Sequence, residues 1–176
     1  MFFLIIPGGS SCFGLEAGSF DMLIDEGYFP GVKRLIDSAK KTVQIMMFEA
    51  AYYKQHAASP SNQLIQALMD ARKRGVKVEA VLEAGDKKDD RVTMNNLLTG
   101  GLLKKSGIDV TLDPANSTTH TKLLIIDESL VVLGSTNWTY SALTKNHEVS
   151  TVIYSPEAAH RLGDYFQMVK RSGKKF

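Results

Sequence analysis

Apolar residues along this chain follow two spacings. Some recur every three or four positions, as on one face of a helix, and others form the short apolar runs typical of buried strands. The pattern predicts helices at 27–41, 62–74, 92–105, 138–143 and 156–170, and strands at 43–48, 76–82, 108–112, 119–126, 130–133 and 148–154. Strands that alternate with helices favour an α/β domain with a central mixed sheet flanked by helices on both faces.

The composition is that of an ordinary globular protein, with 44% hydrophobic and 23% charged residues. A net charge of +2 permits a phosphate-rich partner without requiring one. Basic residues gather in three clusters: Lys33, Arg34, Lys40 and Lys41; Arg72, Lys73, Arg74 and Lys77; Lys170, Arg171, Lys174 and Lys175. These clusters suit solvated helix ends, whereas a nucleic-acid track would need them on the same face as the candidate chemistry below. The single cysteine, Cys12, leaves no internal disulfide.

The stretch HTKLLIIDESLVVLGSTN at 120–137 carries the candidate chemistry. Side chains alternate along a strand, so we expect His120 and Lys122 on the same face. After the next strand, Ser135 and Asn137 are again two positions apart, so we expect their side chains on the same side. An imidazole, an ammonium, a hydroxyl and an amide at neighbouring strand ends suit a phosphoryl group.

This stretch resembles the HKD motif, HxKxxxxDxxxxxxGSxN, of the phospholipase D superfamily. The matched positions are His120, Lys122, Asp127, Gly134, Ser135 and Asn137. The resemblance implies a phospholipase D-like catalytic domain over 20–176, preceded by an N-terminal edge segment over 1–19. Larger members carry two motifs, whereas this chain carries one and has room for one domain. The short members that it resembles are homodimeric endonucleases, so the resemblance implies a homodimer.

The resemblance also implies roles for the motif residues. His120 would be the nucleophile that forms a phosphohistidine, with the partner copy's histidine as general acid, and the two would titrate as a coupled pair. Lys122, Ser135 and Asn137 would bind the phosphate. No acidic pair or His/Asp cluster shows metal-ligand spacing, so we expect neither a metal nor another cofactor, with the lysine in place of a divalent cation.

The two acidic candidates receive different roles. Asp127 lies at an odd offset from His120 within a turn-forming Asp-Glu-Ser cluster, so we expect it, with Gly134, to be structural and to fix a hairpin. Glu148 matches the family's glutamate that orients the imidazole, and we expect it to be catalytic in that sense. Its neighbour His147 should point away.

Two loops and the N-terminus leave alternatives open. Segments 54–61 and 84–91 follow predicted strands and could carry specificity or be plain solvent loops. The apolar N-terminal run is too short for a secretory signal and lacks a basic leader, so we expect an edge strand or surface segment. No run of 18 apolar residues predicts a membrane span. We expect a cytoplasmic location, with secreted and membrane-anchored forms left open.

The function that these features favour is metal-independent phosphodiester hydrolysis, by an endonuclease that prefers single-stranded DNA or RNA. A phospholipase is the alternative, because the apolar N-terminal segment and Phe13, Phe20, Tyr28 and Phe29 could touch lipid. A third possibility is a dimer that binds nucleic acid without turnover.

Overall fold

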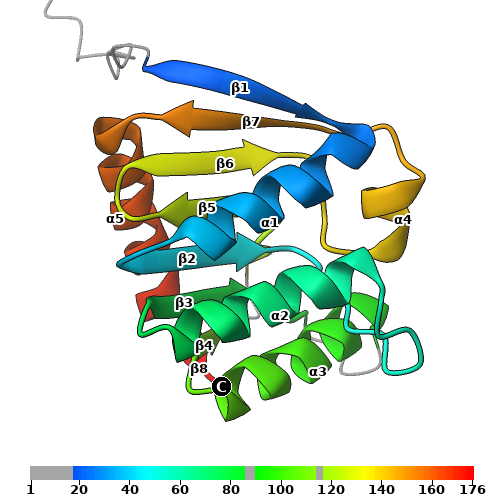
Figure 1. The fold of residues 1–176 in the computed structure, drawn as a ribbon. Coiled ribbons are helices and arrows are strands. Elements are labelled where there is room, and N and C mark those ends of the chain that lie inside the picture. Colours follow the sequence, from blue (N-terminus) through cyan, green and yellow to red (C-terminus); the bar gives the residue numbers. More distant parts are fainter. Residues whose placement is uncertain (1–17, 86–89, 114–116) are drawn as a thin grey trace, which may run out of the picture.

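One mixed sheet forms the centre of the molecule (Figure 1). Within residues 18–85, 90–113 and 117–176, which the computed structural model describes, the sheet has eight strands in the order β1-β7-β6-β5-β2-β3-β4-β8. The strands are β1 (Ser19–Ile24), β2 (Thr42–Met47), β3 (Lys77–Leu82), β4 (Asp109–Leu112), β5 (Lys122–Ile126), β6 (Leu130–Gly134), β7 (Val149–Tyr154) and β8 (Lys174–Lys175).

The strand directions determine which strands begin and which end on each of the two sides of the sheet that lie across the strand ends. β2, β3 and β4 are parallel, whereas β5 lies antiparallel to β2, and β6, β7 and β1 continue in alternating directions. The ends of β2, β3 and β6 therefore meet the starts of β5 and β7 at one edge. We call this line of strand ends the Lys122 edge, after the first residue of β5. The name does not refer to an outermost strand of the sheet. The opposite edge holds the β5–β6 turn and the starts of β2 and β3.

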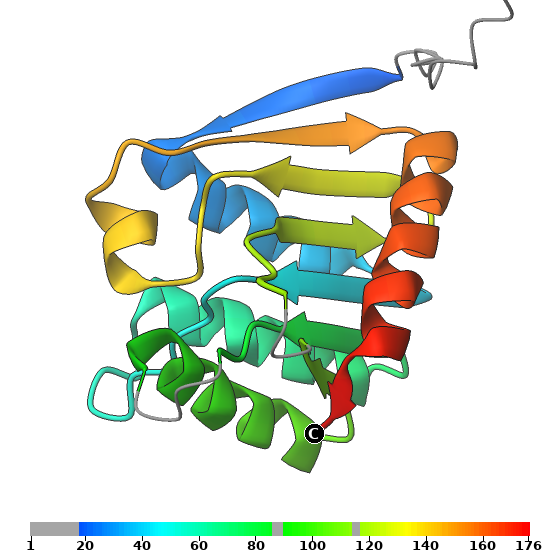
Figure 2. The same ribbon diagram turned by 180° about the vertical axis from the view of Figure 1, so that it is seen from behind.

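Helices cover both faces of the sheet. Figure 1 shows α1 (Tyr28–Ser38), α2 (Pro60–Lys73) and α3 (Arg91–Lys105) on one face, and Figure 2 shows α5 (Pro156–Ser172) on the other. The short helices η1 (Asp25–Gly27) and α4 (Tyr140–Thr144) lie at the Lys122 edge. None of the helices in the described ranges has both the length and the apolarity to cross a bilayer. The predicted α/β fold with helices on both faces is confirmed.

Each helical layer packs its own core against the sheet. Buried side chains of α1 and α2, such as Ile36 and Leu68, join the first cluster, and Phe166 of α5 packs with Leu123 and Val131 in the second. Sequence signals account for the helix boundaries. Pro60 stands in the first turn of α2, and Gly75 and Gly107 follow α2 and α3 with positive φ angles of 92° and 80°, which glycine adopts without strain.

One strand prediction that matters for the site is wrong. The strand expected at 119–126 begins only at Lys122. The amide of Thr119 donates to Glu83 Oε2 at 2.6 Å, and that of His120 donates to Thr118 O at 3.0 Å, so neither amide joins the sheet ladder. His120 therefore lies in the connection before β5, and the alternation argument does not apply to it.

The sequence pattern also missed the outermost strands. β1 is exposed along most of its length and β8 has two residues, so neither shows the buried positions on which strand prediction depends. The expected N-terminal edge segment over 1–19 falls mainly on 1–17, which with Cys12 lies outside the described residues. The edge strand that is described begins at Ser19 and extends into the region expected to be the catalytic domain.

Candidate active site

Lys122 is a buried cation at the start of β5. It pairs with Met47 of β2 and is 8% exposed. Its Nζ donates to the His120 carbonyl at 2.7 Å and lies 4.8 Å from the centre of the Phe48 ring. Burial lowers the pKa of Lys122, while the negative charge of Glu148 opposes that shift. The ammonium group therefore has a cation–π contact and one carbonyl, but no anion at ion-pair distance among the described residues.

The imidazole of His120 is exposed and rests on the same aromatic ring. The centres of the His120 and Phe48 rings are 4.6 Å apart, with the planes tilted by 58°. Phe48, the residue directly after β2, thus contacts both His120 and Lys122. Sequence reasoning took Phe48 only as the last residue of a buried strand, and nothing in the apolar run VQIMMF distinguishes it. This shared ring brings His120 and Lys122 together although they do not lie on one regular strand.

Glu148 lies before β7 and is 9% exposed, at the same edge of the sheet. Its Oε2 accepts a hydrogen bond from Ser135 Oγ, and its Oε1 accepts one from Asn146 Nδ2 at 3.0 Å. Among the described residues, no hydrogen bond joins Glu148 to His120. Within one chain, the carboxylate that was expected to orient the imidazole is instead held by Ser135 and Asn146.

Two further features hold Glu148 in place. Asp25 of η1 accepts the Glu148 amide at 2.7 Å, and the Asp25 amide donates to Glu148 O at 2.9 Å. At Gly134, an added Cβ would come within 2.4 Å of Ser150 and of the Val149 carbonyl. Only glycine allows β6 to approach β7 this closely, and the approach brings Ser135 beside Glu148. Asp25 had no signal in the sequence because it lies more than a hundred residues away from its partner.

Asn137 lies in the connection between β6 and α4. Its Oδ1 is buried and has no hydrogen-bond partner among the described residues. The next residue anchors the segment, because the Trp138 amide donates to Glu49 O at 2.9 Å and Trp138 O accepts from the Ala51 amide at 2.9 Å. An unpartnered buried amide costs free energy unless a ligand or water completes it. Rotation of the amide group by 180° would present Nδ2 as a donor in the same position.

Asp127 lies at the opposite edge, in the turn between β5 and β6. Its carboxylate accepts hydrogen bonds from the backbone amides of Lys40, Lys41 and Thr42 at 2.7–3.2 Å. Burial alone would raise the pKa of Asp127, but these amides outweigh it and leave the pKa below its ordinary value. The expected β5–β6 hairpin is confirmed. The contacts of Asp127 support a structural role and place it away from His120.

A second layer of polar residues fixes the loops of the Lys122 edge. The buried Asn96 of α3 accepts from the Ala50 amide at 2.8 Å and donates to the carbonyls of Phe48 and Glu83. Glu83 anchors the segment before His120 through Thr119. Burial raises the pKa of the Glu83 carboxyl, and the neighbouring Asp113 raises it further. Sequence reasoning missed this layer because its contacts join residues far apart along the chain.

The three basic clusters do not gather at the Lys122 edge. Lys40 and Lys41 precede β2, and Arg72, Lys73, Arg74 and Lys77 lie at the end of α2 and the start of β3, all at the opposite edge (Figure 1). Lys33 and Arg34 lie in the middle of α1, Lys170 and Arg171 at the end of α5, and Lys174 and Lys175 in β8, where Lys174 pairs with Leu112, the last residue of β4. His147 is fully exposed and its Nδ1 lies 3.3 Å from Asp25 Oδ2. Of the segment expected as a loop at 54–61, residues 54–59 lie at the Lys122 edge between β2 and α2, and residues 60–61 begin α2. Residues 86–89 of the other candidate loop lie outside the described residues.

No group of three or more His, Cys, Asp or Glu side chains in the described ranges is arranged to hold a metal ion. The positive charge of the site comes from Lys122. What the arrangement offers is an exposed imidazole, a buried ammonium group and a buried amide at one sheet edge, a set that can bind and attack a phosphate ester.

Comparison with known proteins identifies the class. The model of the family described as cardiolipin synthase, PLD-like domain, matches residues 32–170. The chain belongs to this family, and the expected membership of the phospholipase D superfamily is confirmed. In structure, the chain is similar to Nuc from Salmonella typhimurium, a phospholipase D family member, with a TM-score of 0.75 and 25% identity over 90% of this chain and 99% of that one.

Relatives in sequence carry two different names. A phospholipase D of Rickettsia bellii is 29% identical over 151 residues, which is 85% of this chain and 63% of the relative. A mitochondrial cardiolipin hydrolase of Homo sapiens is 29% identical over 143 residues, which is 81% of this chain and 48% of the relative. The chain thus spans about half to two thirds of the length of these relatives.

Proposed function

We propose that this protein is a metal-independent phosphodiesterase, and more specifically an endonuclease that cleaves single-stranded nucleic acid in a composite homodimer site. The observation that carries the proposal is that a buried Lys122, with no anion at ion-pair distance among the described residues, and an exposed His120 contact the same Phe48 ring. The ammonium group supplies a fixed charge for a phosphate, and the neighbouring imidazole is accessible to that phosphate.

The proposed chemistry has two steps. An imidazole nitrogen of His120 attacks phosphorus, and the bond from phosphorus to the leaving oxygen breaks as that oxygen takes a proton from the partner's His120. Water then attacks the phosphohistidine, gives its proton back to the partner's His120, and releases the phosphate group and free His120. Lys122 and Asn137 stabilise the negative charge that develops on the non-bridging oxygens. Ser135, whose hydroxyl already donates to Glu148, contributes its part mainly by positioning that carboxylate.

A second copy completes what one chain lacks. The chain has one motif histidine, and within one chain Glu148 does not reach it in the described structure. A two-fold axis beside the Lys122 edge would bring a second His120 and a second Glu148 to the same phosphate, so that each imidazole could meet an acceptor from the other copy. The homodimer is therefore part of the proposed site rather than an addition to it.

An exposed apolar strip beside the site is the surface that we assign to the second copy. Phe20, Met22 and Ile24 of β1 are aligned with β7, and Leu133 of β6 and Val149 of β7 share their face of the sheet. All five are exposed, including Phe20 at 62% and Ile24 at 58%. In Figure 2, α5 crosses the sheet near the opposite edge and leaves this part of the face bare. Val149 directly follows Glu148, and Leu133 lies two residues before Ser135, so the strip continues into the site.

Matched methionine variants test the dimer. Met22→Glu places a charge in the strip, and Met168→Glu places the same charge on α5 at a similar exposure, 54% against 49%. We expect Met22→Glu to sediment as a monomer and to lose turnover, while Met168→Glu remains dimeric and active. A wild-type protein that is fully active as a monomer would contradict the composite site.

The second candidate function is phospholipid hydrolysis, which the names of the relatives favour. The structure removes part of the lipid-contact argument, because Tyr28 is buried at 3% and Phe29 packs on the core. Phe20 is exposed, but it lies in the strip assigned to the second copy, and Phe13 lies outside the described residues. For a nucleic-acid substrate we favour single strands, because a flexible single strand enters a groove at a two-fold axis more readily than a stiff duplex does.

One experiment separates these functions. The purified protein is incubated in EDTA with single-stranded DNA, single-stranded RNA, duplex DNA, phosphatidylcholine and cardiolipin, with His120→Ala as the inactive variant and His160→Ala as the control. We expect cleavage of single strands, and an acid-labile adduct between protein and strand at short times. Activity that disappears in EDTA and returns with magnesium would refute the mechanism. Lipid hydrolysis without strand cleavage would assign the protein to the second candidate, and tight binding without turnover would leave the non-catalytic dimer.

A further inference from the structure

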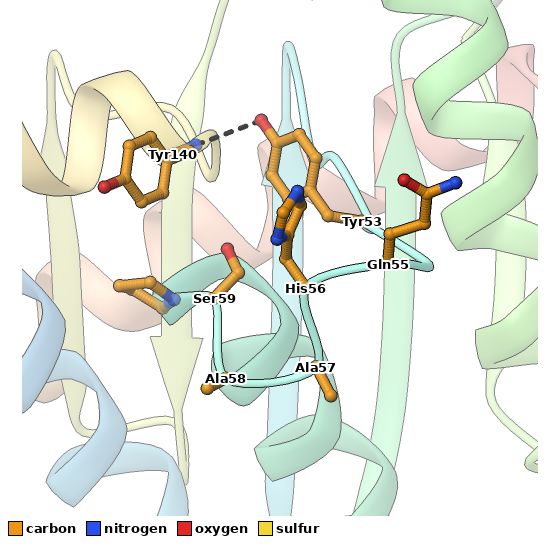
Figure 3. A pocket seen from close by; sticks show the side chains of 8 residues that line it. Tyr53, Gln55, His56, Ala57, Ala58, Ser59 and Tyr140 are labelled. Atoms are coloured by element: carbon orange, nitrogen blue, oxygen red, sulfur yellow. Dashed lines mark hydrogen bonds between the residues drawn. The ribbon is translucent and has the colours of Figure 1, made fainter.

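A pocket of about 780 Å³ opens at the Lys122 edge and is not used by the chemistry described above. Its walls come from the loop after β2, the start of α2 and the first residue of α4 (Figure 3). The lining residues that matter here are Tyr53, Gln55, His56, Ser59, Pro60 and Tyr140. The volume falls within the range of small-molecule sites, roughly 300–1,000 Å³.

Two chain segments lead directly from the site to this pocket. Tyr53 follows Phe48 by five residues and Tyr140 follows Asn137 by three. The two segments are bonded together between these points, because Ala50 and Trp138 form a parallel bridge. At 3.3–3.6 Å per residue, the Cα of Tyr140 lies within about 11 Å of the Cα of Asn137. The Tyr140 wall of the pocket therefore lies near Asn137, one of the residues proposed to bind the phosphate.

The pocket lining combines aromatic rings with a hydroxyl group that has no hydrogen-bond partner among the described residues. The amide of Tyr140 donates to the Tyr53 hydroxyl at 3.1 Å, which fixes the two tyrosines relative to each other. Ser59 is 7% exposed, and its Oγ is buried without a partner among the described residues. In Figure 3 this hydroxyl points between the Tyr140 ring and the His56 ring. A buried hydroxyl without a partner indicates that a ligand group or a water completes it.

We propose that this pocket holds an unpaired nucleobase of the strand whose phosphate lies at His120 and Lys122. The proposal rests on the proposed nuclease function and deepens it. A base is planar and stacks on tyrosine or histidine rings, and its ring-edge atoms can pair with the Ser59 hydroxyl and the Gln55 amide. A base already paired in a duplex cannot enter, so the pocket gives a structural reason for a preference for single strands.

Charge at the pocket rim favours a nucleic acid over a lipid tail. The Lys145 Nζ lies 5.5 Å from the centre of the Tyr140 ring, and the exposed Lys54 is adjacent to Gln55. These cations are placed to contact the phosphates on either side of a bound base. An acyl chain would leave the Ser59 hydroxyl unpaired and would gain nothing from the two lysines.

Binding measurements on the inactive His120→Ala dimer test the base contact without cleavage. A labelled single-stranded oligonucleotide is compared with the same strand carrying abasic sites. Adding Tyr140→Ala should weaken binding of the intact strand by roughly 5- to 150-fold, the scale of losing one stacked base, and should leave the abasic strand unaffected. Tyr165→Ala, at 42% exposure against 45% for Tyr140, is the matched control and should change neither. Ser59→Ala should weaken the intact strand by a smaller factor, and serves as the second variant if Tyr140→Ala does not fold.

Cleavage assays with His120 intact keep the two proposals apart. Efficient cleavage that does not depend on Tyr140, Ser59 or the presence of bases would overturn the pocket proposal and leave the nuclease function standing. Base-dependent binding without any cleavage would uphold the pocket and refute the catalytic proposal. Binding of cardiolipin vesicles that depends on Tyr140, with no binding of oligonucleotides, would assign the pocket to an acyl chain and overturn the inference.

Discussion

Two lysines with little exposed surface lie at opposite edges of the sheet, and their surroundings differ. Lys170 of α5, with a side chain 15% exposed, donates to Glu79 and to Asp109, the latter at 2.6 Å. Burial by itself lowers the pKa of both lysines. The two carboxylates outweigh burial and raise the pKa of Lys170, whereas the charge of Glu148 offsets burial only in part and the pKa of Lys122 stays lowered.

The two lysines differ in function: we interpret Lys170 as a structural cation and Lys122 as a cation that binds an anionic ligand. Lys170 has its counter-charges in the fold, so its charge is stabilised whether or not a ligand is present. Lys122 has a carbonyl and an aromatic ring, so its charge is destabilised in the free protein and would be stabilised by a bound phosphate. The basic clusters carry more total charge, but most of their residues lie away from the Lys122 edge. The buried Lys122 is the cation to which we assign a catalytic role.

The largest expected effect concerns the carboxylates at the two edges. Glu148→Gln should lower turnover by roughly 10²–10⁴-fold, because in the proposed dimer the imidazole loses the carboxylate of the other copy that orients it. The melting temperature should be nearly unchanged. Asp127→Asn should instead lower the free energy of unfolding by about 1–3 kcal/mol, because it weakens the bonds to three backbone amides. Turnover per folded molecule should persist in Asp127→Asn.

Single-turnover cleavage and thermal melting, measured on both variants, decide this assignment. A stable but inactive Asp127→Asn together with an active Glu148→Gln would reverse the two roles. It would also mean that Asp127 of one copy lies close to His120 of the other copy in the dimer, although the two residues are far apart within one chain.

The second prediction exchanges each lysine for methionine. Lys122→Met should lower turnover by about 10²–10³-fold, the scale of losing one electrostatic contact to the transition state. It should also raise the free energy of unfolding by about 1 kcal/mol, because a buried unpaired charge is removed. Lys170→Met should leave turnover unchanged and lower the free energy of unfolding by about 2–3 kcal/mol, since the buried Glu79 loses Lys170 and keeps only the exposed Lys77 as a cationic partner among the described residues.

Chemical denaturation and initial-rate measurements on the two variants test the comparison directly. If Lys122→Met proved less stable than the parent, the free-state ammonium would be favourably solvated, and the contrast between the edges would fail. The sign of the stability change is therefore as informative as the loss of activity.

Much of the fold could be predicted because local signals determine it. The apolar spacing gave the positions of the five predicted helices to within a few residues, and Gly75 and Gly107 stood where the helices end. The six motif positions were identified by their resemblance to the HKD motif of the phospholipase D superfamily, which lies within eighteen consecutive residues. These features depend on residues close together in the sequence, where periodicity and turn chemistry operate.

The rest depends on contacts that the sequence does not display. His120 leaves the predicted strand because Glu83, thirty-six residues earlier, captures the Thr119 amide. Asp25 supports Glu148 across more than a hundred residues. The position of Lys40, Lys41 and Lys77 at the opposite edge follows from strand direction, which no local pattern encodes. Such long-range pairings require the folded structure.

The smallest expected effect concerns two buried glutamates, one in β3 and one directly after it, and it extends the comparison to pH. Glu79 in β3 lies near the opposite edge. Burial would raise its pKa, but hydrogen bonds from Lys170 and Lys77 leave it below the ordinary value of 4.5. The stability from Glu79 is therefore present above about pH 4.5 and is lost as the pH falls through its lower folded pKa. Glu79→Gln should lower stability at neutral pH and weaken this loss in acid.

Glu83, directly after β3 at the Lys122 edge, should behave in the opposite way. Burial and the neighbouring Asp113 raise its pKa above 4.5, so the folded state holds the proton more tightly than the unfolded state. Its contribution is complete below pH 4.5 and is lost as the pH rises through the folded pKa. In Glu83→Gln, the amide oxygen can still accept from Thr119, and the amide nitrogen can donate to Asp113 Oδ2, which is buried without a partner among the described residues. We expect a gain of about 1 kcal/mol at neutral pH and no gain near pH 4, measured by urea denaturation across that range. A variant that loses more stability at neutral pH than near pH 4 would show that the carboxylate itself, rather than its protonated form, is what the Lys122 edge requires.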